Sequence, residues 1–363
     1  MSLTFLMAGG GTGGHVVPAL AVARELRRRG HEPFFVGTRE GIESRLVPRE
    51  GFPLEWIEIG GLKGLGWRRR LRTLWQLRAS VLASRRILSR RRPAALFSMG
   101  GYVAAPPMLA AIARRLPMVL MEPNAVAGLT SRWLGRFAAR ALISFEQTAA
   151  SFPAGRSEVT GLPVRDEFFA MRHRPESAEF TVLVTGGSQG SRTLNEAARA
   201  SWPALAREPV RMILQCGRAR ENELAAEFAQ VGMRGEVRAF LEDMPTEFAK
   251  ADLIVARAGA GSLSELCAAG KPSVLVPYPF AADDHQRANA EALAKTGAAR
   301  MVLDADMRGE RLCEEIAWAR RHRGELDAMA AAARKLAKTG AAQRAADLLE
   351  ELASTRKTNG GKT

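Results

Sequence analysis

The stretch MAGGGTGGHVVPALAVARELRRRG, residues 7–30, decides the fold of the first part of the chain. It follows the apolar segment LTFLMA and places five glycines directly before His15. Glycine loses much conformational entropy on folding, so such a cluster indicates unusual backbone dihedrals or the close approach of a ligand. Apolar residues then recur at helical spacing until Gly30, which is a stop signal. The stretch predicts a strand, a glycine loop and a helix whose N-terminus can bind an anion.

Short apolar runs alternate with helix-like stretches along the rest of the chain. Each run is bounded by Gly, Pro or polar residues, which is typical of buried parallel strands in a doubly wound α/β fold. These runs lie at residues 31–37, 94–99, 117–122, 141–145, 180–185, 210–217, 251–257 and 272–278.

An internal repeat predicts two similar domains. The segment that begins at Leu3 is similar in sequence to the segment that begins at residue 180, and in this alignment GGTGGH (10–15) corresponds to GGSQGS (186–191). Ligands of open α/β sheets bind beyond the carboxyl ends of the strands, where these loops lie. We expect a first domain over residues 1–162 with a helix at about 340–354 packing back on it, a second domain over 163–339, and a disordered tail over 355–363 that lacks apolar anchors.

Composition and charge limit the function classes. With 363 residues, 47% hydrophobic and 25% charged, the chain resembles ordinary soluble globular proteins. It has no apolar run of 18 residues and no signal peptide pattern at its start. Three widely spaced cysteines give neither a zinc pattern nor a disulfide framework. The net charge of +15 favours anionic partners.

Residues 67–92 carry ten arginines and no acidic residue, with apolar residues at helical spacing. An arginine-rich amphipathic helix with tryptophans is typical of attachment to an anionic membrane surface. The alternative is a helix that packs its apolar face inward and solvates its basic back. We expect a mixture, in which the C-terminal half packs inward and lipid contacts are made by Trp67, Arg68, Leu71 and Trp75. Nucleic acid is a third possibility, but no recognised binding module supports it.

The first glycine loop admits two interpretations. Gly9-x-Gly11-x-x-Gly14 satisfies the dinucleotide fingerprint, which leaves an NAD-dependent oxidoreductase as an alternative, although the acidic residue expected after the second strand is missing. A helix N-terminus disfavours a protonated imidazole, so His15 is suited to accept a proton as a general base. The competing interpretation is a structural histidine.

The second half offers candidate sites for a phosphorylated sugar. The loop GGSQGS, with Gly190 and Ser191, predicts a phosphate site or simply a tight turn between a strand and a helix. GAGS (259–262) opens a helix with Glu265 one turn inside, where a carboxylate can accept two ribose hydroxyls or merely satisfy a charge preference. Polar side chains that suit hydroxyl recognition, or that simply form an ordinary polar loop, gather past a strand end at Asp283, Asp284, His285, Gln286 and Asn289.

Seven segments of the chain together resemble the MurG family of GT-B glycosyltransferases. They are GGGTGGHVVPALAVA, SMGGYVAAPP, EPNAVAGLTSRWL, TGLPVR, TGGSQGSRTLNE, FLEDM and RAGAGSLSELCAAGKPSVLVPYPFAADDHQRANA. The resemblance runs in order from about residue 3 to 345. It implies two Rossmann-like domains facing across a cleft. It also implies inverting transfer of GlcNAc from UDP-GlcNAc to the C4 hydroxyl of MurNAc in undecaprenyl-diphospho-MurNAc-pentapeptide, a step of peptidoglycan synthesis. The enzyme is then expected on the cytoplasmic face of the bacterial membrane, as a peripheral protein.

The resemblance also implies roles for individual residues. His15 becomes the catalytic base, and the acceptor is expected at Thr12, Gly13, Gly14, Tyr102, Glu122 and Asn124. The donor is expected at Arg165, Gly190 and Ser191, with Leu241 and Met244 at the uracil, Ala260, Gly261 and Ser262 at the diphosphate, Glu265 at the ribose, and His285, Gln286 and Asn289 at the sugar.

The expected partners are UDP-GlcNAc, the lipid-linked acceptor and an anionic membrane surface, with no nucleic acid. Because no Asp-x-Asp motif occurs, the sequence requires no catalytic metal, and no cofactor is expected. The alternatives that remain are an NAD-dependent oxidoreductase and a basic module that binds membranes or nucleic acid.

Overall fold

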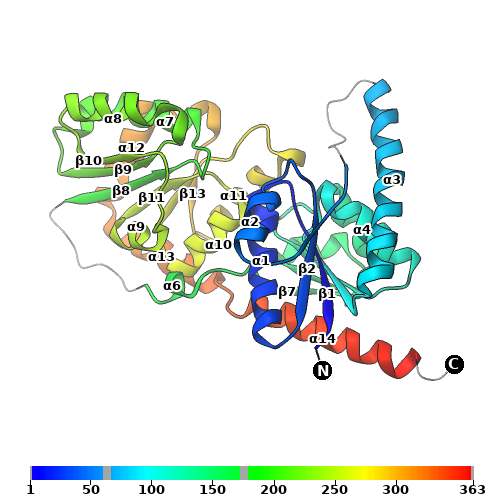
Figure 1. Ribbon diagram of the computed structural model, residues 1–363. Helices are drawn as coiled ribbons and strands as arrows, with labels where there is room; N and C mark the ends of the chain where they lie inside the picture. Colours follow the sequence, from blue (N-terminus) through cyan, green and yellow to red (C-terminus); the bar gives the residue numbers. More distant parts are fainter. Residues whose placement is uncertain (1, 60–66, 172–178, 361–363) are drawn as a thin grey trace. The chain divides into compact units, whose positions relative to one another are not determined.

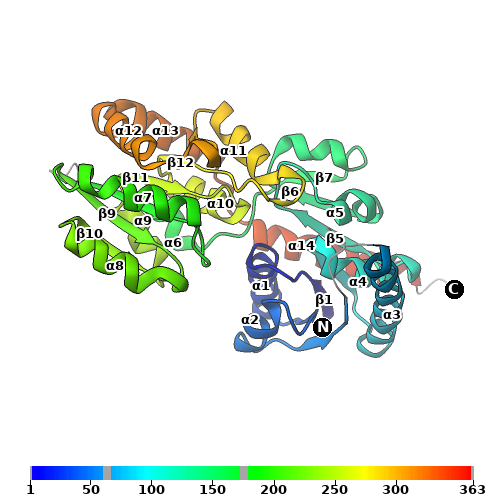
Figure 2. The same ribbon diagram turned by 90° about the horizontal axis from the view of Figure 1, so that it is seen from above.

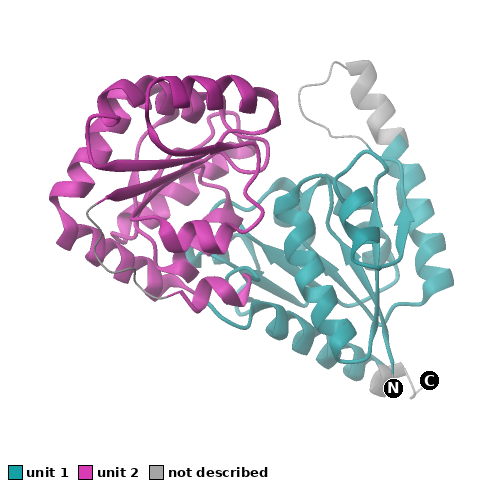
Figure 3. Ribbon diagram, turned by 60° about the vertical axis from the view of Figure 1, so that its left-hand side comes forward, with its two compact units in different colours: residues 1–163, 338–363 teal, residues 164–337 magenta. Residues whose placement is uncertain are grey.

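The computed structural model describes residues 2–59, 67–171 and 179–360, without the side chains of 67–75 and 357–360 (Figure 1). The chain divides into two units, coloured separately in Figure 3. Unit 1 comprises residues 1–163 and 338–363, and unit 2 comprises residues 164–337. Both boundaries lie within two residues of those expected from the sequence.

Unit 1 contains a parallel sheet that, among the described residues, has seven strands in the order β3-β2-β1-β4-β5-β6-β7. The strands are β1 (Thr4–Ala8), β2 (Glu32–Gly37), β3 (Leu54–Trp56), β4 (Ala95–Ser98), β5 (Met118–Glu122), β6 (Arg140–Ile143) and β7 (Ser157–Val159). The helices are α1 (Gly13–Arg28), α2 (Glu43–Arg49), α3 (Trp67–Arg91), α4 (Gly101–Ala113), α5 (Leu129–Leu134) and α14 (Ala341–Gly360), with short turns η1 (Gly135–Phe137) and η2 (Glu146–Ser151).

Unit 2 repeats this plan with six parallel strands in its described part, in the order β10-β9-β8-β11-β12-β13. The strands are β8 (Phe180–Thr185), β9 (Val210–Gln215), β10 (Arg234–Arg238), β11 (Leu253–Ala256), β12 (Ser273–Leu275) and β13 (Arg300–Met301). The helices and turns are α6 (Asp166–Phe169), α7 (Arg192–Leu205), η3 (Arg218–Arg220), α8 (Glu221–Gln230), α9 (Met244–Lys250), α10 (Ala260–Ala269), η4 (Ala282–Asp284), α11 (His285–Lys295), η5 (Asp304–Asp306), α12 (Gly309–Arg321) and α13 (Arg323–Leu336).

The predicted doubly wound α/β fold with two domains is confirmed. In each sheet the strand order reverses beside the first strand, between β1 and β4 in unit 1 and between β8 and β11 in unit 2. A crevice for ligands forms at such a switch point, outside the carboxyl ends of the two strands. The loops that follow these four strands therefore define where to look for a site.

The predicted strands are the buried ones, and the strands that the sequence analysis missed lie at the sheet edges. β1, β4, β5 and β8 are buried along almost their whole length, so they read as continuous apolar runs. The missed strands β3, β7, β10 and β13 form the four edges, are only partly buried and mix polar with apolar residues. An edge strand has one exposed flank, which removes the apolar signal.

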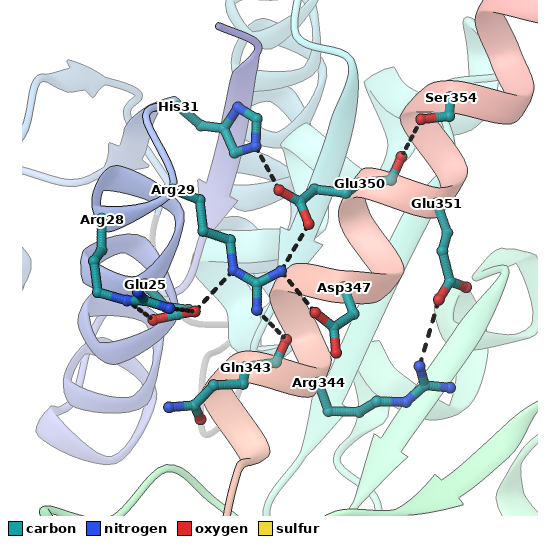
Figure 4. A network of polar contacts seen from close by, with 10 residues as sticks. All are labelled: Glu25, Arg28, Arg29, His31, Gln343, Arg344, Asp347, Glu350, Glu351 and Ser354. Carbon is teal, nitrogen blue, oxygen red and sulfur yellow. Dashed lines mark hydrogen bonds and ion pairs between the residues drawn. The ribbon is translucent and has the colours of Figure 1, made fainter. Parts of the chain in front are cut away.

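The C-terminal helix α14 belongs to unit 1 because a polar network joins it to α1 (Figure 4). Arg29, at the end of α1, donates to Asp347 at 2.6 Å and to Glu350 at 2.7 Å, and its Nε donates to Glu25. His31 also contacts Glu350 through Nε2 at 2.7 Å. Hydrogen bonds from Arg28 and Arg29 lower the pKa of Glu25 to about 2, so this nearly buried carboxylate is charged at neutral pH.

The expectation of a disordered tail from residue 355 is wrong for residues 355–360, because α14 continues to Gly360. The hydroxyls of Ser354 and Thr355 donate to carbonyls one turn earlier, so these polar side chains are accommodated within the helix. Residues 361–363 lie outside the described part.

The basic stretch forms α3, which lies alongside α4 in Figures 1 and 2. Its C-terminal half packs inward through Ile87 and Leu88, which are buried. The side chains proposed to contact lipid, Trp67, Arg68, Leu71 and Trp75, lie outside the described residues. Within the described part of the chain, no helix combines the length and the apolar character needed to cross a bilayer.

Candidate functional site

In unit 1 the glycine loop after β1 meets the start of α4, which follows β4. A Cβ on Gly11 would lie 2.9 Å from the Tyr102 ring, and one on Gly101 would lie 3.0 Å from the His15 ring. The absence of side chains at these two glycines is what lets the two loops approach. The structure thus brings together three of the predicted residues, Thr12, His15 and Tyr102, at the switch point of the sheet.

The contacts of His15 favour one tautomer. Its Nδ1 lies 3.3 Å from the Gly10 carbonyl oxygen and 3.4 Å from Thr12 Oγ1. Because a carbonyl oxygen can only accept, Nδ1 carries the hydrogen in the first contact, and Nε2 then holds the lone pair. The imidazole is half-buried in the first turn of α1. This arrangement provides a proton acceptor at Nε2.

Tyr102 remains a hydrogen-bond donor at neutral pH. Its side chain is 39% exposed, and burial of the remainder, together with the charges of Glu43 and Glu40, raises the pKa of the phenol above its ordinary value. The nearby Gly13 and Gly14 differ from Gly11, because a Cβ at either would meet no atom closer than 3.9 Å. Packing within the chain therefore does not require glycine there, whereas the approach of a ligand would.

Glu122 and Asn124 form a separate cluster after β5, the next strand of the sheet. The Glu122 carboxylate is buried and accepts hydrogen bonds from the Asn124 backbone at 3.1 Å, the Asn124 side chain at 3.2 Å and the Gly128 backbone at 3.2 Å. Glu122 thus orders the loop 122–128. The half-buried Asn124 is the member of the pair that is accessible to a ligand.

The two loops at the switch point of unit 2 have different roles. At the start of α7, Ser191 accepts a hydrogen bond from Leu194 N, so its side chain caps the helix. Gly190 has a left-handed φ of +74°, and a Cβ there would lie 2.1 Å from the Cys216 oxygen. Both residues predicted to bind phosphate therefore also have a part in shaping the turn.

Helix α10, after β11, begins without such a cap. Its N-cap is Gly259, which has no side chain to accept from the first N–H groups. Cβ atoms on Gly259 and Gly261 would meet nothing within 4 Å. The start of α10, with Ala260, Gly261 and Ser262, is partly exposed and has no side-chain cap, so its first N–H groups and the positive end of the helix dipole can face an anion.

Glu265 lies one turn into α10, near Arg165. Burial raises the pKa of its carboxyl to about 7, and the Arg165 guanidinium acts in the opposite direction. Arg165 precedes α6 and lies 5.1 Å over the Phe168 ring. The structure therefore places a carboxyl with a pKa of about 7 and an arginine close to a partly exposed helix N-terminus.

The segment after β12 supplies the remaining polar residues. Asp283 and Asp284 both adopt left-handed φ values, a conformation that aspartate tolerates better than most residues, and α11 begins directly after them. His285 Nδ1 donates to the Ala282 carbonyl at 2.6 Å, and Gln286 accepts from Tyr278 N at 3.0 Å. Asn289 is fully buried and donates to the Ala258 carbonyl, so it connects α11 to the loop before α10.

The segment FLEDM follows β10. Leu241 is buried and Met244 is half-buried at the start of α9, where Asp243 caps the helix by accepting from Thr246 N. The segment thus presents a short apolar surface held by a capped helix.

Several polar residues that are buried or partly buried support these loops and were not predicted from the sequence. In unit 1, Glu43 accepts from the backbone of the glycine loop. In unit 2, Thr185 donates to Gln215 at 2.6 Å and accepts from Gly187 N, and Arg257 donates to Asp304 at 2.5 Å. Except for Gly187, these partners are distant in sequence, so no local motif marks them. Among the described residues, no group of three or more His, Cys, Asp or Glu is arranged to hold a metal ion.

Comparisons with known proteins agree on one family. The model of the glycosyltransferase family 28 N-terminal domain matches residues 5–143, and that of the family 28 C-terminal domain matches residues 181–349. The second match runs past unit 2 into α14.

Two curated relatives carry the name UDP-N-acetylglucosamine–N-acetylmuramyl-(pentapeptide) pyrophosphoryl-undecaprenol N-acetylglucosamine transferase. The protein from Solibacter usitatus is 57% identical over 352 residues, which cover 96% of both chains. The one from Methylococcus capsulatus is 42% identical and covers 97% of this chain and 99% of its own. The crystal structure of Acinetobacter baumannii MurG matches with a TM-score of 0.81 at 33% identity, covering 96% of this chain and 99% of that one. These matches support neither the dehydrogenase alternative nor the binding-module alternative.

Proposed function

The chain belongs to the MurG family within glycosyltransferase family 28, and we propose that it transfers GlcNAc from UDP-GlcNAc to the C4 hydroxyl of MurNAc in undecaprenyl-diphospho-MurNAc-pentapeptide. The two relatives, which match this chain over almost their whole length, carry the name of this activity. This transfer is a step of peptidoglycan synthesis. The observation in the structure that best supports a nucleotide-sugar site is the uncapped start of α10 with Glu265 behind it.

The donor diphosphate binds at the first turn of α10. The N–H groups of Ala260, Gly261 and Ser262 lack intrahelical partners, as at every helix start, and Gly259 leaves them uncapped. The diphosphate carries its negative charge to the positive end of the helix, where Arg165 adds a further positive charge. Ser191 and Gly190 support this site through the shape of the neighbouring loop rather than through a phosphate contact.

The rest of the donor is recognised on both sides of this point. Glu265 accepts hydrogen bonds from the two ribose hydroxyls, which favour its charged form. Leu241 and Met244 pack against the uracil. His285 and Gln286 bind hydroxyls of the sugar, and the buried Asn289 keeps α11 in place relative to α10.

The transfer itself is a displacement at the anomeric carbon. Nε2 of His15 removes the proton from the C4 hydroxyl of MurNAc, and the oxygen forms a bond to the anomeric carbon as the bond to UDP breaks, with inversion. UDP leaves with the electron pair of that bond. The helix N–H groups and Arg165 stabilise the charge that develops on its phosphate. Thr12, Tyr102 and Asn124 bind the acceptor, while Glu122 orders the loop that carries Asn124.

A lipid-linked acceptor requires unit 1 to work at a membrane, and we place the protein at the cytoplasmic face as a peripheral enzyme. In the described part of unit 1, α5 and the turn η1 that follows it offer a suitable surface. Leu129, Trp133 and Phe137 recur every four residues and are each about half exposed. The Arg136 guanidinium lies 5.4 Å over the Trp133 ring and 5.5 Å over the Phe137 ring. Apolar and aromatic side chains flanked by arginine suit an anionic lipid surface.

The test is transfer of radiolabelled GlcNAc from UDP-GlcNAc to a short-chain lipid analogue of the acceptor. We expect a labelled product that depends on both substrates. Absence of product with folded protein, combined with a Tm raised by NAD and not by UDP, would overturn the proposal in favour of an oxidoreductase. Salt-sensitive binding of nucleic acid without transfer would instead indicate a binding module.

A further inference from the structure

Glu43 is a fully buried carboxylate to which the proposed chemistry gives no role. It opens α2, and its relative exposure is 0%. Its Oε2 accepts from Gly11 N at 2.8 Å, and its Oε1 accepts from both the backbone N–H and the hydroxyl of Thr38, each at 2.8 Å. One side chain therefore connects the glycine loop after β1 to the end of β2. Buried carboxylates are costly unless they are hydrogen-bonded, and Glu43 is bonded on both oxygens.

Three glycines from two separate segments make room for this carboxylate. A Cβ on Gly10 would lie 2.6 Å from Glu43 Oε1, one on Gly37 2.5 Å from its Cγ, and one on Gly41 2.1 Å from its Oε2. The loops are thus shaped around the side chain of Glu43. Packing explains these glycines, in contrast to the open Gly13 and Gly14.

The backbone that Glu43 holds is the backbone that places the reacting groups. Gly10 provides the carbonyl 3.3 Å from His15 Nδ1, and Gly11 provides the surface against which the Tyr102 ring packs. A shift of the Gly10–Gly11 segment would move the carbonyl that fixes the tautomer and ring orientation of His15. It would also move the support of Tyr102.

We propose that Glu43 is a positioning residue for the transfer reaction: its carboxylate fixes the glycine loop so that His15 presents Nε2 to the acceptor hydroxyl. This inference rests on the proposed function, because it takes His15 as the base. Glu43 itself does not contact the substrates, since it is fully buried.

The variant Glu43→Gln tests the proposal with little change of shape. An amide has one oxygen and one NH₂ group, so the NH₂ must face the N–H of either Gly11 or Thr38 and one hydrogen bond is lost. The matched control is Glu40→Gln, which removes the same charge from an exposed position three residues earlier. Both variants remove a negative charge that acts on Tyr102, so a difference between them reports on the loop.

We expect Glu43→Gln to lower kcat by about 10-fold to 100-fold at saturating substrates, the loss that follows when a reacting group is misplaced by about 1 Å. The KM for UDP-GlcNAc should remain within about twofold, since the donor binds in unit 2, and Glu40→Gln should match the unmodified enzyme. In a His15→Ala background, Glu43→Gln should lower kcat by less than about twofold more, because the group that it positions is gone.

Two results would overturn the proposal: an unchanged kcat in folded Glu43→Gln, or the same fold-loss in the presence and absence of His15. Should Glu43→Gln not fold, Thr38→Val removes one hydroxyl donor and keeps the carboxylate, and the same cycle with His15→Ala is measured on it. Failure of the proposed base is recognised separately, because His15→Ala alone would then retain normal turnover.

Discussion

The helices that follow the first strand of each sheet begin in different ways. In unit 2, the side chain of Ser191 caps α7, and the loop before it is held by neutral groups, Thr185 and Gln215. In unit 1, α1 has no side-chain cap bond from Thr12, and a charged residue from a different segment, Glu43, holds the loop. Two similar strand–loop–helix segments are thus stabilised by different side chains.

The difference between capped and uncapped helix starts indicates where an anionic ligand can bind. The capped start of α7 has one N–H group fewer to offer an anion, whereas the uncapped start of α10 keeps its own available. We therefore propose that the glycine loop before α7 in unit 2 has mainly a structural role. The nucleotide is expected at the neighbouring strand, β11. In unit 1 the loop instead carries an imidazole, and its glycines serve the approach of Tyr102 and the packing of Glu43.

The largest effect on turnover is expected from His15→Ala, which removes the imidazole that the loop of unit 1 carries and the loop of unit 2 lacks. General-base catalysis contributes about 10²-fold to 10⁴-fold, so turnover should fall by that factor. The measurement is kcat for transfer to the lipid acceptor analogue, with UDP-GlcNAc affinity as the control, which should not change. Near-normal turnover would show that the loop of unit 1 does not supply the base.

The variant Gly261→Val should show whether the diphosphate binds at the start of α10 rather than at the start of α7. A Cβ at Gly261 meets nothing within the chain, so folding should be little affected, while the added methyl groups would obstruct a diphosphate at the helix start. Loss of one charge-assisted hydrogen bond predicts UDP-GlcNAc affinity about 10-fold to 100-fold weaker, measured by calorimetry. The matched control is Gly324→Val, at an equally open glycine in α13. Unchanged affinity in the Gly261 variant would exclude α10 as the diphosphate site.

The pH dependence of donor binding should report on Glu265. Its carboxyl is protonated below a pKa of about 7, and the ribose hydroxyls favour the charged form, so affinity for UDP-GlcNAc should rise about tenfold between pH 6 and pH 8. Without ligand the sign is opposite for folding: the folded state keeps a proton that the unfolded chain releases, so this group lowers the free energy of unfolding as pH rises from 4.5 to about 7. Both trends should disappear in Glu265→Gln, and their persistence there would assign them to another group.

The smallest effect is expected from Ser191→Ala. Loss of an N-cap side chain costs about 1 kcal/mol, so the free energy of unfolding measured with denaturant should fall by that amount while UDP-GlcNAc affinity stays nearly constant. Thr12→Ala is the matched control for stability, because Thr12 makes no cap hydrogen bond to α1. A large loss of donor affinity in Ser191→Ala would restore the phosphate-binding role that the sequence first suggested.

The buried central strands of both sheets could be predicted from the sequence, and the edge strands could not. β1, β8 and the other buried strands are apolar because both faces are covered, and this leaves a signal in the sequence. β3, β7, β10 and β13 have an open flank and lack it. The tail after residue 355 was judged by its polar composition, but a helix can continue over polar residues when its hydroxyls bond to its own backbone.

At the site, local patterns indicated His15 and Glu265, because each lies at the start of a helix after a glycine-rich loop, whereas Tyr102 was expected only from the family resemblance. Glu43 could not be found in this way. Its hydrogen-bond partners, Gly11 and Thr38, lie in two separate segments, and an acid in the first turn of a short helix has the ordinary appearance of a surface charge. Ser191 shows the converse difficulty, since a helix cap and a phosphate ligand have the same sequence signal.

The most direct measurement is a crystal structure of the protein with UDP-GlcNAc. We expect the diphosphate oxygens within hydrogen-bonding distance of the N–H groups of Ala260, Gly261 and Ser262, with both ribose hydroxyls on the Glu265 carboxylate. A diphosphate bound instead at the glycine loop before α1, or at the capped start of α7, would contradict it.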